Sequence, residues 1–136
     1  HTAPYAGIME LLAELKEKGI PTAVVSNKSD AAVKELCREI FGELVPLAIG
    51  ESERVKKKPA PDTVIEAAAG IRVPLKDCVY VGDSEVDIAT AENAGIPCIS
   101  VSWGFRDREL LESLGAKMLL DTVAELRDCL LDMAAK

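Results

Sequence analysis

The sequence predicts a three-layer α/β fold, with a parallel sheet lying between helices. Amphipathic helical patterns alternate with short, continuously apolar runs along the whole chain. One such run holds adjacent Val24 and Val25 and is too short for a helix, which is typical of a strand covered on both faces. No repeat, linker or low-complexity tract interrupts the alternation, so residues 1–136 are expected to form a single domain.

The first half of the chain predicts two helices and two strands. The first helix ends at Lys18-Gly19, a basic last turn followed by a glycine stop. A strand over 21–27 and a second helix carrying Val33 and Cys37 follow, and then a strand over 44–50, in which Pro46 favours an edge position. The apolar residues that define the first helix have i, i+3, i+4, i+7 spacing: Ile8, Leu11, Leu12 and Leu15.

The second half continues the alternation. Pro61 and Asp62 suit the first turn of a helix over 61–70, and Asp121-Thr122 can cap a last helix. The other expected elements are a strand over 77–82, a helix over 84–95 closed by Gly95, a strand over 97–102, a short helix ending at Gly115 and a strand over 117–120.

Composition excludes several classes of function. The net charge of −7 argues against a nucleic-acid partner, because phosphate backbones select a surplus of Lys and Arg. No apolar stretch approaches the roughly 20 residues that cross a bilayer, so no membrane association is expected. The four cysteines form no C-x-x-C pair and have apolar neighbours, which predicts reduced, mostly buried thiols in a cytoplasmic protein.

Acidic side chains crowd the end of the 77–82 strand. Asp83 should lie just past the strand tip and Asp87 one helical turn later, so both carboxylates can face one point. Oxygen-only ligands of this kind suit Mg²⁺. An alternative is that these acids only complement the helix dipole, with Ser84 as the N-cap.

Two further groups are expected at the same edge of the sheet. Ser26 and Asn27 end a strand and open a helix, where a hydroxyl and free N–H groups can bind an anion, although an ordinary N-cap would look the same. Lys58 follows two other lysines and precedes Pro59, so a stiffened backbone can aim its ammonium, although most lysine runs are solvated surface. A metal ion, a hydroxyl and a lysine at one edge of the sheet are typical of a phosphate-binding site.

Three stretches resemble the second, third and fourth motifs of the haloacid dehalogenase (HAD) superfamily. They are "VVSNK", "KKKPAPD" and "VYVGDSEVDIATAENAGIP", in that order. Together with the flanking segments, the resemblance covers essentially the whole chain and is to the phosphoglycolate phosphatase branch. It implies a Rossmann-like αβα core with a parallel sheet. It also implies a Mg²⁺-dependent phosphatase that acts on a small phosphorylated metabolite such as 2-phosphoglycolate.

The resemblance also implies a role for each matching residue. Ser26 would hydrogen-bond the transferring phosphoryl group, with Asn27 beside it, and Lys58 would neutralise charge on the nucleophile and the phosphate. Asp83 would ligate Mg²⁺. Asp87 would support the metal directly or through water, or would hold Lys58.

The first motif of the family, D-x-D-G-T, does not occur in the sequence, and neither does a cap domain. The family's first strand is implied to lie centrally, between the strand ending at Ser26 and the one ending at Gly82. We therefore expect the C-terminal portion of a core with two unpaired strand edges, inactive by itself because it lacks the nucleophile. Either a companion N-terminal fragment or self-association would complete the sheet, or the sheet has rearranged.

Two other classes of function fit parts of the pattern. A non-catalytic phosphate- or metal-binding, or regulatory, module would keep the pocket without the chemistry. A receiver domain also has an acidic Mg²⁺ site and a lysine, but its acids precede the hydroxyl and the lysine, whereas here the order is Ser26, Lys58, Asp83.

Overall fold

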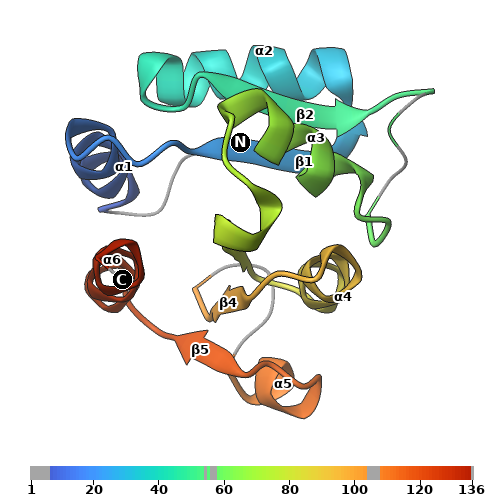
Figure 1. The fold of residues 1–136 in the computed structure, drawn as a ribbon. Helices are drawn as coiled ribbons and strands as arrows, with labels where there is room; N and C mark the ends of the chain where they lie inside the picture. Colours follow the sequence, from blue (N-terminus) through green and yellow to red (C-terminus); the bar gives the residue numbers. More distant parts are fainter. Residues whose placement is uncertain (1–6, 54, 56–57, 104–107, 136) are drawn as a thin grey trace.

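The computed structural model describes residues 7–53, 55, 58–103 and 108–135. It is an α/β fold in which all paired strands are parallel, so the predicted fold class is confirmed (Figure 1). The first five elements are α1 (Ile8–Glu17), β1 (Ala23–Ser29), α2 (Asp30–Phe41), the 3₁₀ turn η1 (Gly42–Leu44) and β2 (Leu47–Glu51).

The second half adds three strands and four helices. These elements are α3 (Asp62–Ile71), the 3₁₀ turn η2 (Leu75–Asp77), β3 (Tyr80–Gly82), α4 (Glu85–Ala94), β4 (Cys98–Val101), α5 (Arg108–Ser113), β5 (Met118–Leu120) and α6 (Val123–Ala134). Left-handed glycines follow the ends of the helices that the sequence assigns to them, with φ of 75° at both Gly19 and Gly95.

The described strands form two sheets instead of one. β1 pairs with β2, from Ala23 opposite Leu47 onward, and β4 lies between β3 and β5. No ladder joins β1 to β3 within the described residues. The division falls at the place expected for a central strand. Val81, in the middle of β3, is 40% exposed.

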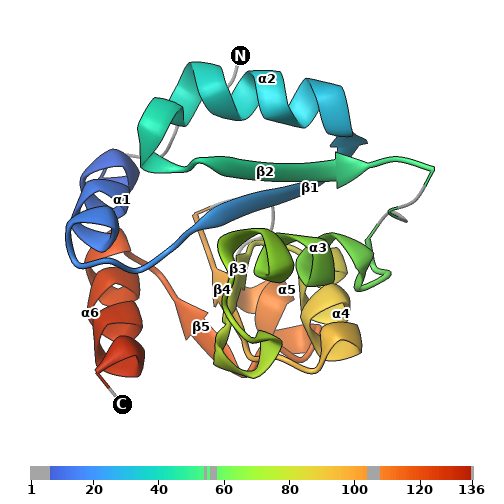
Figure 2. The same cartoon turned by 45° about the horizontal axis from the view of Figure 1, so that its top comes forward.

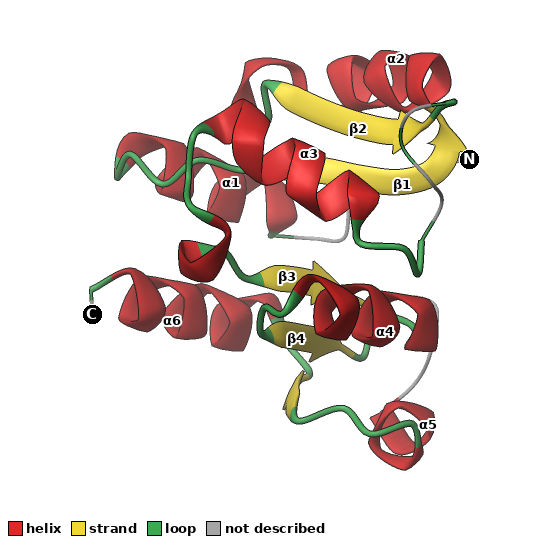
Figure 3. Cartoon of the chain, turned by 45° about the vertical axis from the view of Figure 1, so that its right-hand side comes forward, coloured by secondary structure: helices red, strands yellow, loops and turns green. Residues whose placement is uncertain are grey.

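Helices cover both sheets. Figure 2 shows α2 and α3 on opposite faces of the β1–β2 pair, and Figure 3 shows α4 and α6 beside β3 and β4. The two halves are joined by apolar packing. Leu11 and Leu15 of α1 contact Ile99 of β4 and Leu126 of α6, while Val64 of α3 packs in a cluster with β3 and α4. This packing between the two halves brings the carboxyl ends of β1 and β3 to the same region of the molecule.

The end of β1 differs from the sequence-based prediction. The strand continues to Ser29 through a shift of register after Val25, so Ser26 and Asn27 lie within its irregular end. The N-cap of α2 is Ser29, whose hydroxyl accepts a hydrogen bond from the N–H of Ala32 at 3.4 Å. The interpretation of Ser26 and Asn27 as ordinary helix caps is therefore wrong.

The cysteines agree with only part of the prediction. All four are free thiols, as expected, but only Cys37 is buried, and the other three are half-buried. None of the helices in the described ranges is both long and apolar enough to span a bilayer.

Candidate functional site

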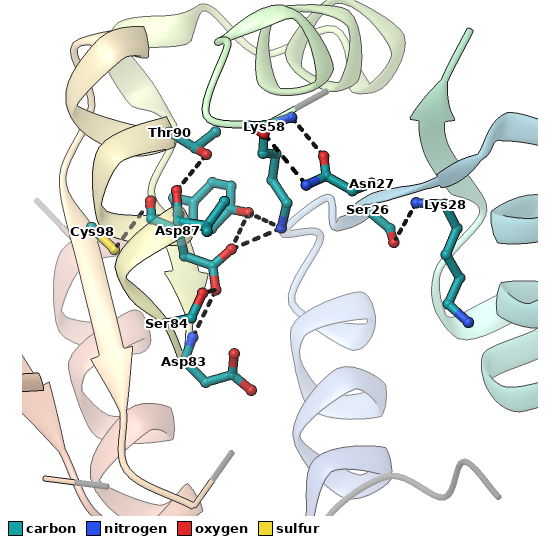
Figure 4. Close-up of polar contacts among 11 residues, drawn as sticks. Ser26, Asn27, Lys28, Lys58, Asp83, Ser84, Asp87, Thr90 and Cys98 are labelled. Atoms are coloured by element: carbon teal, nitrogen blue, oxygen red, sulfur yellow. Dashed lines mark hydrogen bonds and ion pairs between the residues drawn. The ribbon is translucent and has the colours of Figure 1, made fainter. Parts of the chain in front are cut away.

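The candidate site is centred on Lys58, which lies between the carboxyl ends of β1 and β3 (Figure 4). Its Nζ is 2.8 Å from Oδ1 of Asp87 and 3.0 Å from the hydroxyl oxygen of Tyr80. The two charged side chains are only 14% and 9% exposed. An ammonium group this well buried needs fixed acceptors, and both come from the β3–α4 unit.

The carboxylate of Asp87 is held on both of its oxygens. Oδ1 accepts hydrogen bonds from Lys58 and from the Tyr80 hydroxyl at 2.7 Å. Oδ2 accepts from the backbone N–H of Asp83 at 2.9 Å and from the Ser84 hydroxyl at 3.2 Å. The last two bonds satisfy groups at the start of α4, as an acid in a first helical turn commonly does. The Asp87 carboxylate thus accepts hydrogen bonds both from the start of α4 and from Lys58.

The surroundings of Asp87 lower the pKa of its carboxyl group. Burial on its own raises this pKa, but the hydrogen bond and positive charge of Lys58, with the donors Tyr80 and the Asp83 N–H, outweigh burial. The pKa of the Tyr80 hydroxyl moves upward, first through burial and then through the negative charge of Asp87. Tyr80 is therefore a neutral donor to an ionised carboxylate.

Gly82 makes this arrangement possible. A Cβ at this position would lie 2.3 Å from Cβ and 2.4 Å from Cγ of Asp87. No side chain larger than hydrogen fits between the end of β3 and the folded-back carboxylate. The glycine before Asp83 is thus needed for the close approach of Asp87 and not for a left-handed turn.

Asn27 contacts the backbone of Lys58. Its Oδ1 accepts from the Lys58 N–H at 2.6 Å, and its Nδ2 donates to the Lys58 carbonyl at 3.4 Å. From α4, Nδ2 of Asn93 donates to the carbonyl of Pro59 at 2.8 Å. The Lys58-Pro59 peptide bond is cis. Side chains from both halves of the molecule therefore fix the segment that carries Lys58.

Ser26 lies apart from this network. Its hydroxyl accepts a hydrogen bond from the N–H of Lys28 at 3.2 Å, and Figure 4 shows it on the far side of Asn27 from Asp87. The structure thus brings together Lys58, Asp87 and Asn27, with Asp83 joined through its backbone. The other two lysines of the run, Lys56 and Lys57, lie outside the described residues.

The candidate Mg²⁺ ligand from the sequence, Asp83, lies directly after β3. Asp83 is half-buried after β3, and in Figure 4 its carboxylate extends away from that of Asp87. Within the described ranges, no three His, Cys, Asp or Glu side chains are placed to share an ion. One or two carboxylates with waters and a phosphate oxygen are a common Mg²⁺ environment, so the chemistry of Asp83 fits this ion.

Sequence reasoning missed two residues of the network, Tyr80 and Asn93. Tyr80 lies in an apolar strand pattern, where an aromatic residue predicts packing alone, and Asn93 lies late in a helix. The one available signal is the phenol, because a buried tyrosine hydroxyl usually has a partner. Nothing in the spacing identifies that partner.

A family model described as haloacid dehalogenase-like hydrolase matches residues 1–95, which include every residue of this network. The chain belongs to this family.

Individual relatives agree with the family assignment. The chain is 29% identical over 136 residues to phosphoglycolate phosphatase of Pseudomonas savastanoi pv. phaseolicola (strain 1448A / Race 6), covering 99% of this chain and 50% of the relative. The chain thus spans about half the length of the curated relatives it matches.

Solved structures share the fold. A provisionally named phosphoglycolate phosphatase from Lactobacillus delbrueckii subsp. bulgaricus ATCC BAA-365 is 42% identical, with a TM-score of 0.90, over 93% of this chain and 53% of that one. A mutant of CbbY from Rhodobacter sphaeroides was solved in complex with xylulose-(1,5)bisphosphate. It is 37% identical, with a TM-score of 0.72, and the match covers 89% of this chain and 55% of that one.

Proposed function

We propose that this chain supplies the phosphate- and metal-binding side of a Mg²⁺-dependent phosphatase of the HAD type. The observation that carries the proposal is the buried Lys58 ammonium, held by Asp87 and Tyr80 beside Asp83 at the strand ends. A lysine ammonium has three N–H donors, and Tyr80 and Asp87 take two of them. The third donor is proposed to bind a phosphate oxygen.

Each candidate residue has a proposed role. Lys58 neutralises charge on the phosphate. Ser26 donates its hydroxyl to the phosphoryl group, since the same hydroxyl now accepts a bond from Lys28 and its own proton can point elsewhere. Asn27 supports the phosphate site through the backbone of Lys58, because both ends of its amide contact that backbone.

Asp83 is the proposed Mg²⁺ ligand, and Asp87 is proposed to hold Lys58 instead of binding the metal directly. Both oxygens of Asp87 already accept two hydrogen bonds each, so its carboxylate is committed to Lys58, Tyr80 and the start of α4. A bound Mg²⁺ would supply charge stabilisation to a transferring phosphoryl group.

The proposed substrate is a small phosphorylated metabolite such as 2-phosphoglycolate. This choice is supported by the names of the relatives, which include phosphoglycolate phosphatases, and by the bisphosphate bound to CbbY. Four free thiols also support a cytoplasmic location.

Ligand-dependent stabilisation of the pure chain tests the binding half of this proposal. Orthophosphate with Mg²⁺ should raise the melting temperature of the wild type, because a ligand that binds only the folded state stabilises it. Lys58→Met should remove the shift, whereas the matched control Lys76→Met, at an exposed lysine, should keep it. A shift that Lys58→Met preserves in full would contradict the proposed role of Lys58.

A turnover assay tests the expectation that the chain alone is inactive, and the sequence upstream separates the enzyme from a non-catalytic binding module. The 136-residue chain contains no D-x-D-G-T, so it should hydrolyse no p-nitrophenyl phosphate by itself. Hydrolysis by pure chain that Asp83→Asn abolishes would refute this expectation. A D-x-D-G-T encoded upstream of His1 would favour the enzyme, and its absence there would favour the binding module.

A further inference from the structure

The Tyr80 hydroxyl lies between the two charged groups at the centre of the site. Its oxygen is 2.7 Å from Oδ1 of Asp87 and 3.0 Å from Nζ of Lys58, and these two atoms are themselves 2.8 Å apart. The three polar atoms thus form a closed triangle. We propose that Tyr80 is a positioning residue that fixes the direction of the Lys58 ammonium group, an inference that rests on the phosphate-binding role proposed for Lys58.

The geometry of an ammonium group gives the hydroxyl this effect. A lysine bound to one carboxylate oxygen can still rotate about that contact, on a stem with four rotatable bonds. A second acceptor at a fixed angle removes the rotation. With two N–H bonds of Lys58 directed at Tyr80 and Asp87, the direction of the third is determined. A donor aimed in advance loses less freedom when an anion binds.

Packing alone does not account for a tyrosine at this position. The ring is 7% exposed and lies in an apolar cluster with Val64, Ala91 and Ile96, where phenylalanine would fill the same volume. A buried hydroxyl is costly unless it has partners, and both partners here are charged groups of the site. Lys58 Nζ also lies 5.7 Å from the centre of the ring, a contact that phenylalanine would keep.

Tyr80→Phe therefore isolates the hydroxyl, and Val64→Ala is its matched control. Val64 belongs to the same cluster but has no polar atom in its side chain, so its truncation lowers stability without touching the triangle. Orthophosphate affinity in the presence of Mg²⁺, measured by calorimetry, should fall about tenfold in Tyr80→Phe and stay within about twofold in Val64→Ala. Equal affinity in Tyr80→Phe and wild type, or an equal loss in both variants, would overturn the proposal.

A second measurement does not depend on phosphate binding. Side-chain ¹⁵N NMR of the wild type should show a slowly exchanging Lys58 ammonium signal, assigned by its loss in Lys58→Met, and Tyr80→Phe should broaden or shift it. A signal that is the same in both proteins, or absent from both, overturns the positioning role. If the wild type binds no orthophosphate, the proposed function fails, and this signal alone decides the role of Tyr80.

The wild type by itself provides a check if Tyr80→Phe does not fold. A nuclear Overhauser contact between the Tyr80 ring and the ε-methylene of Lys58 is expected from the 5.7 Å separation of Nζ and the ring centre. Its absence would overturn the proposal.

Discussion

At the scale of single residues, the Lys58–Asp87 pair is where one change should cost most. Asp87→Asn keeps the shape but removes the negative charge, leaving an ammonium that is 14% exposed without its counter-ion. We expect the free energy of unfolding in urea to fall by roughly 2–4 kcal/mol near neutral pH. Asp128→Asn, at a carboxylate that is 74% exposed beside Arg127, is the control and should change it by less than about 0.5 kcal/mol.

The same pair predicts a direction for pH dependence. The pKa of Asp87 is lower in the folded chain than its ordinary value of 3.8. The ionised Asp87 carboxylate therefore stabilises the fold at pH values above its ordinary pKa. This stabilisation is lost as the pH falls through the lower pKa of the folded chain. The stability gap between wild type and Asp87→Asn should narrow as the pH is lowered below about 4. A gap in the urea midpoints that stays constant down to the acid limit of folding would contradict this assignment.

Gly82 gives a steric prediction. In Gly82→Ala, the new Cβ would lie 2.3 Å from Asp87 Cβ, so the end of β3 or the start of α4 has to move. We expect a loss of about 1–3 kcal/mol in unfolding free energy, as for other overpacked sites. Gly70→Ala is the comparison, because the nearest atom to its Cβ would be Leu47 Cδ2 at 2.5 Å, the end of a flexible side chain. A greater loss in Gly70→Ala would be inconsistent with this account.

At the scale of elements, several helix ends were predictable, whereas the start of α2 and the strand ends were not. Gly95 and Thr122 terminate or cap the helices that the sequence assigns to them, because caps depend on local backbone geometry. The strand predicted over 77–82 begins only at Tyr80, since η2 occupies Leu75–Asp77. β1 runs on to Ser29 because it pairs there with Glu51 of β2, a partner distant in sequence.

The capping box at the start of α6 tests whether local hydrogen bonds stabilise this helix end. The Thr122 hydroxyl accepts from the N–H of Glu125 at 3.1 Å, and Oε1 of Glu125 accepts from the N–H of Thr122, also at 3.1 Å. Thr122→Ala should lower the unfolding free energy by about 1 kcal/mol. Glu125→Gln retains an acceptor oxygen in the capping box and should lower the unfolding free energy by only a few tenths of a kcal/mol. Equal urea midpoints for Thr122→Ala and wild type would mean that the cap is not stabilising.

At the scale of the whole molecule, the sequence located the site but not the contacts within it. The alternation of elements placed Lys58, Asp83 and Asp87 at the carboxyl ends of the strands, where the structure has them. It did not predict that Asn27 and Asn93 hold the backbone at Lys58-Pro59, or that Tyr80 joins the ion pair. The contacts that these residues make with Lys58 and Pro59 join positions 22 to 34 apart, and no spacing rule relates residues across different elements.

The divided sheet makes a last prediction that concerns the molecule as a whole. In a parallel strand, successive N–H groups point to opposite sides. β4 has neighbours on both sides, whereas β1 pairs only with β2 in the described part of the chain. Amide hydrogen exchange in dilute solution should therefore be slowest in β4 and should alternate along β1, with every second amide fast.

The dependence of this exchange on protein concentration tests the expected self-association. If a second copy pairs with the open edge of β1, the fast amides should become protected as the concentration rises, while those of β4 stay unchanged. Protection of all β1 amides to the level of β4, even at high dilution, would contradict the division of the sheet between β1 and β3. Concentration-independent alternation would instead mean that the edge stays open in solution and that copies of this chain do not complete the sheet.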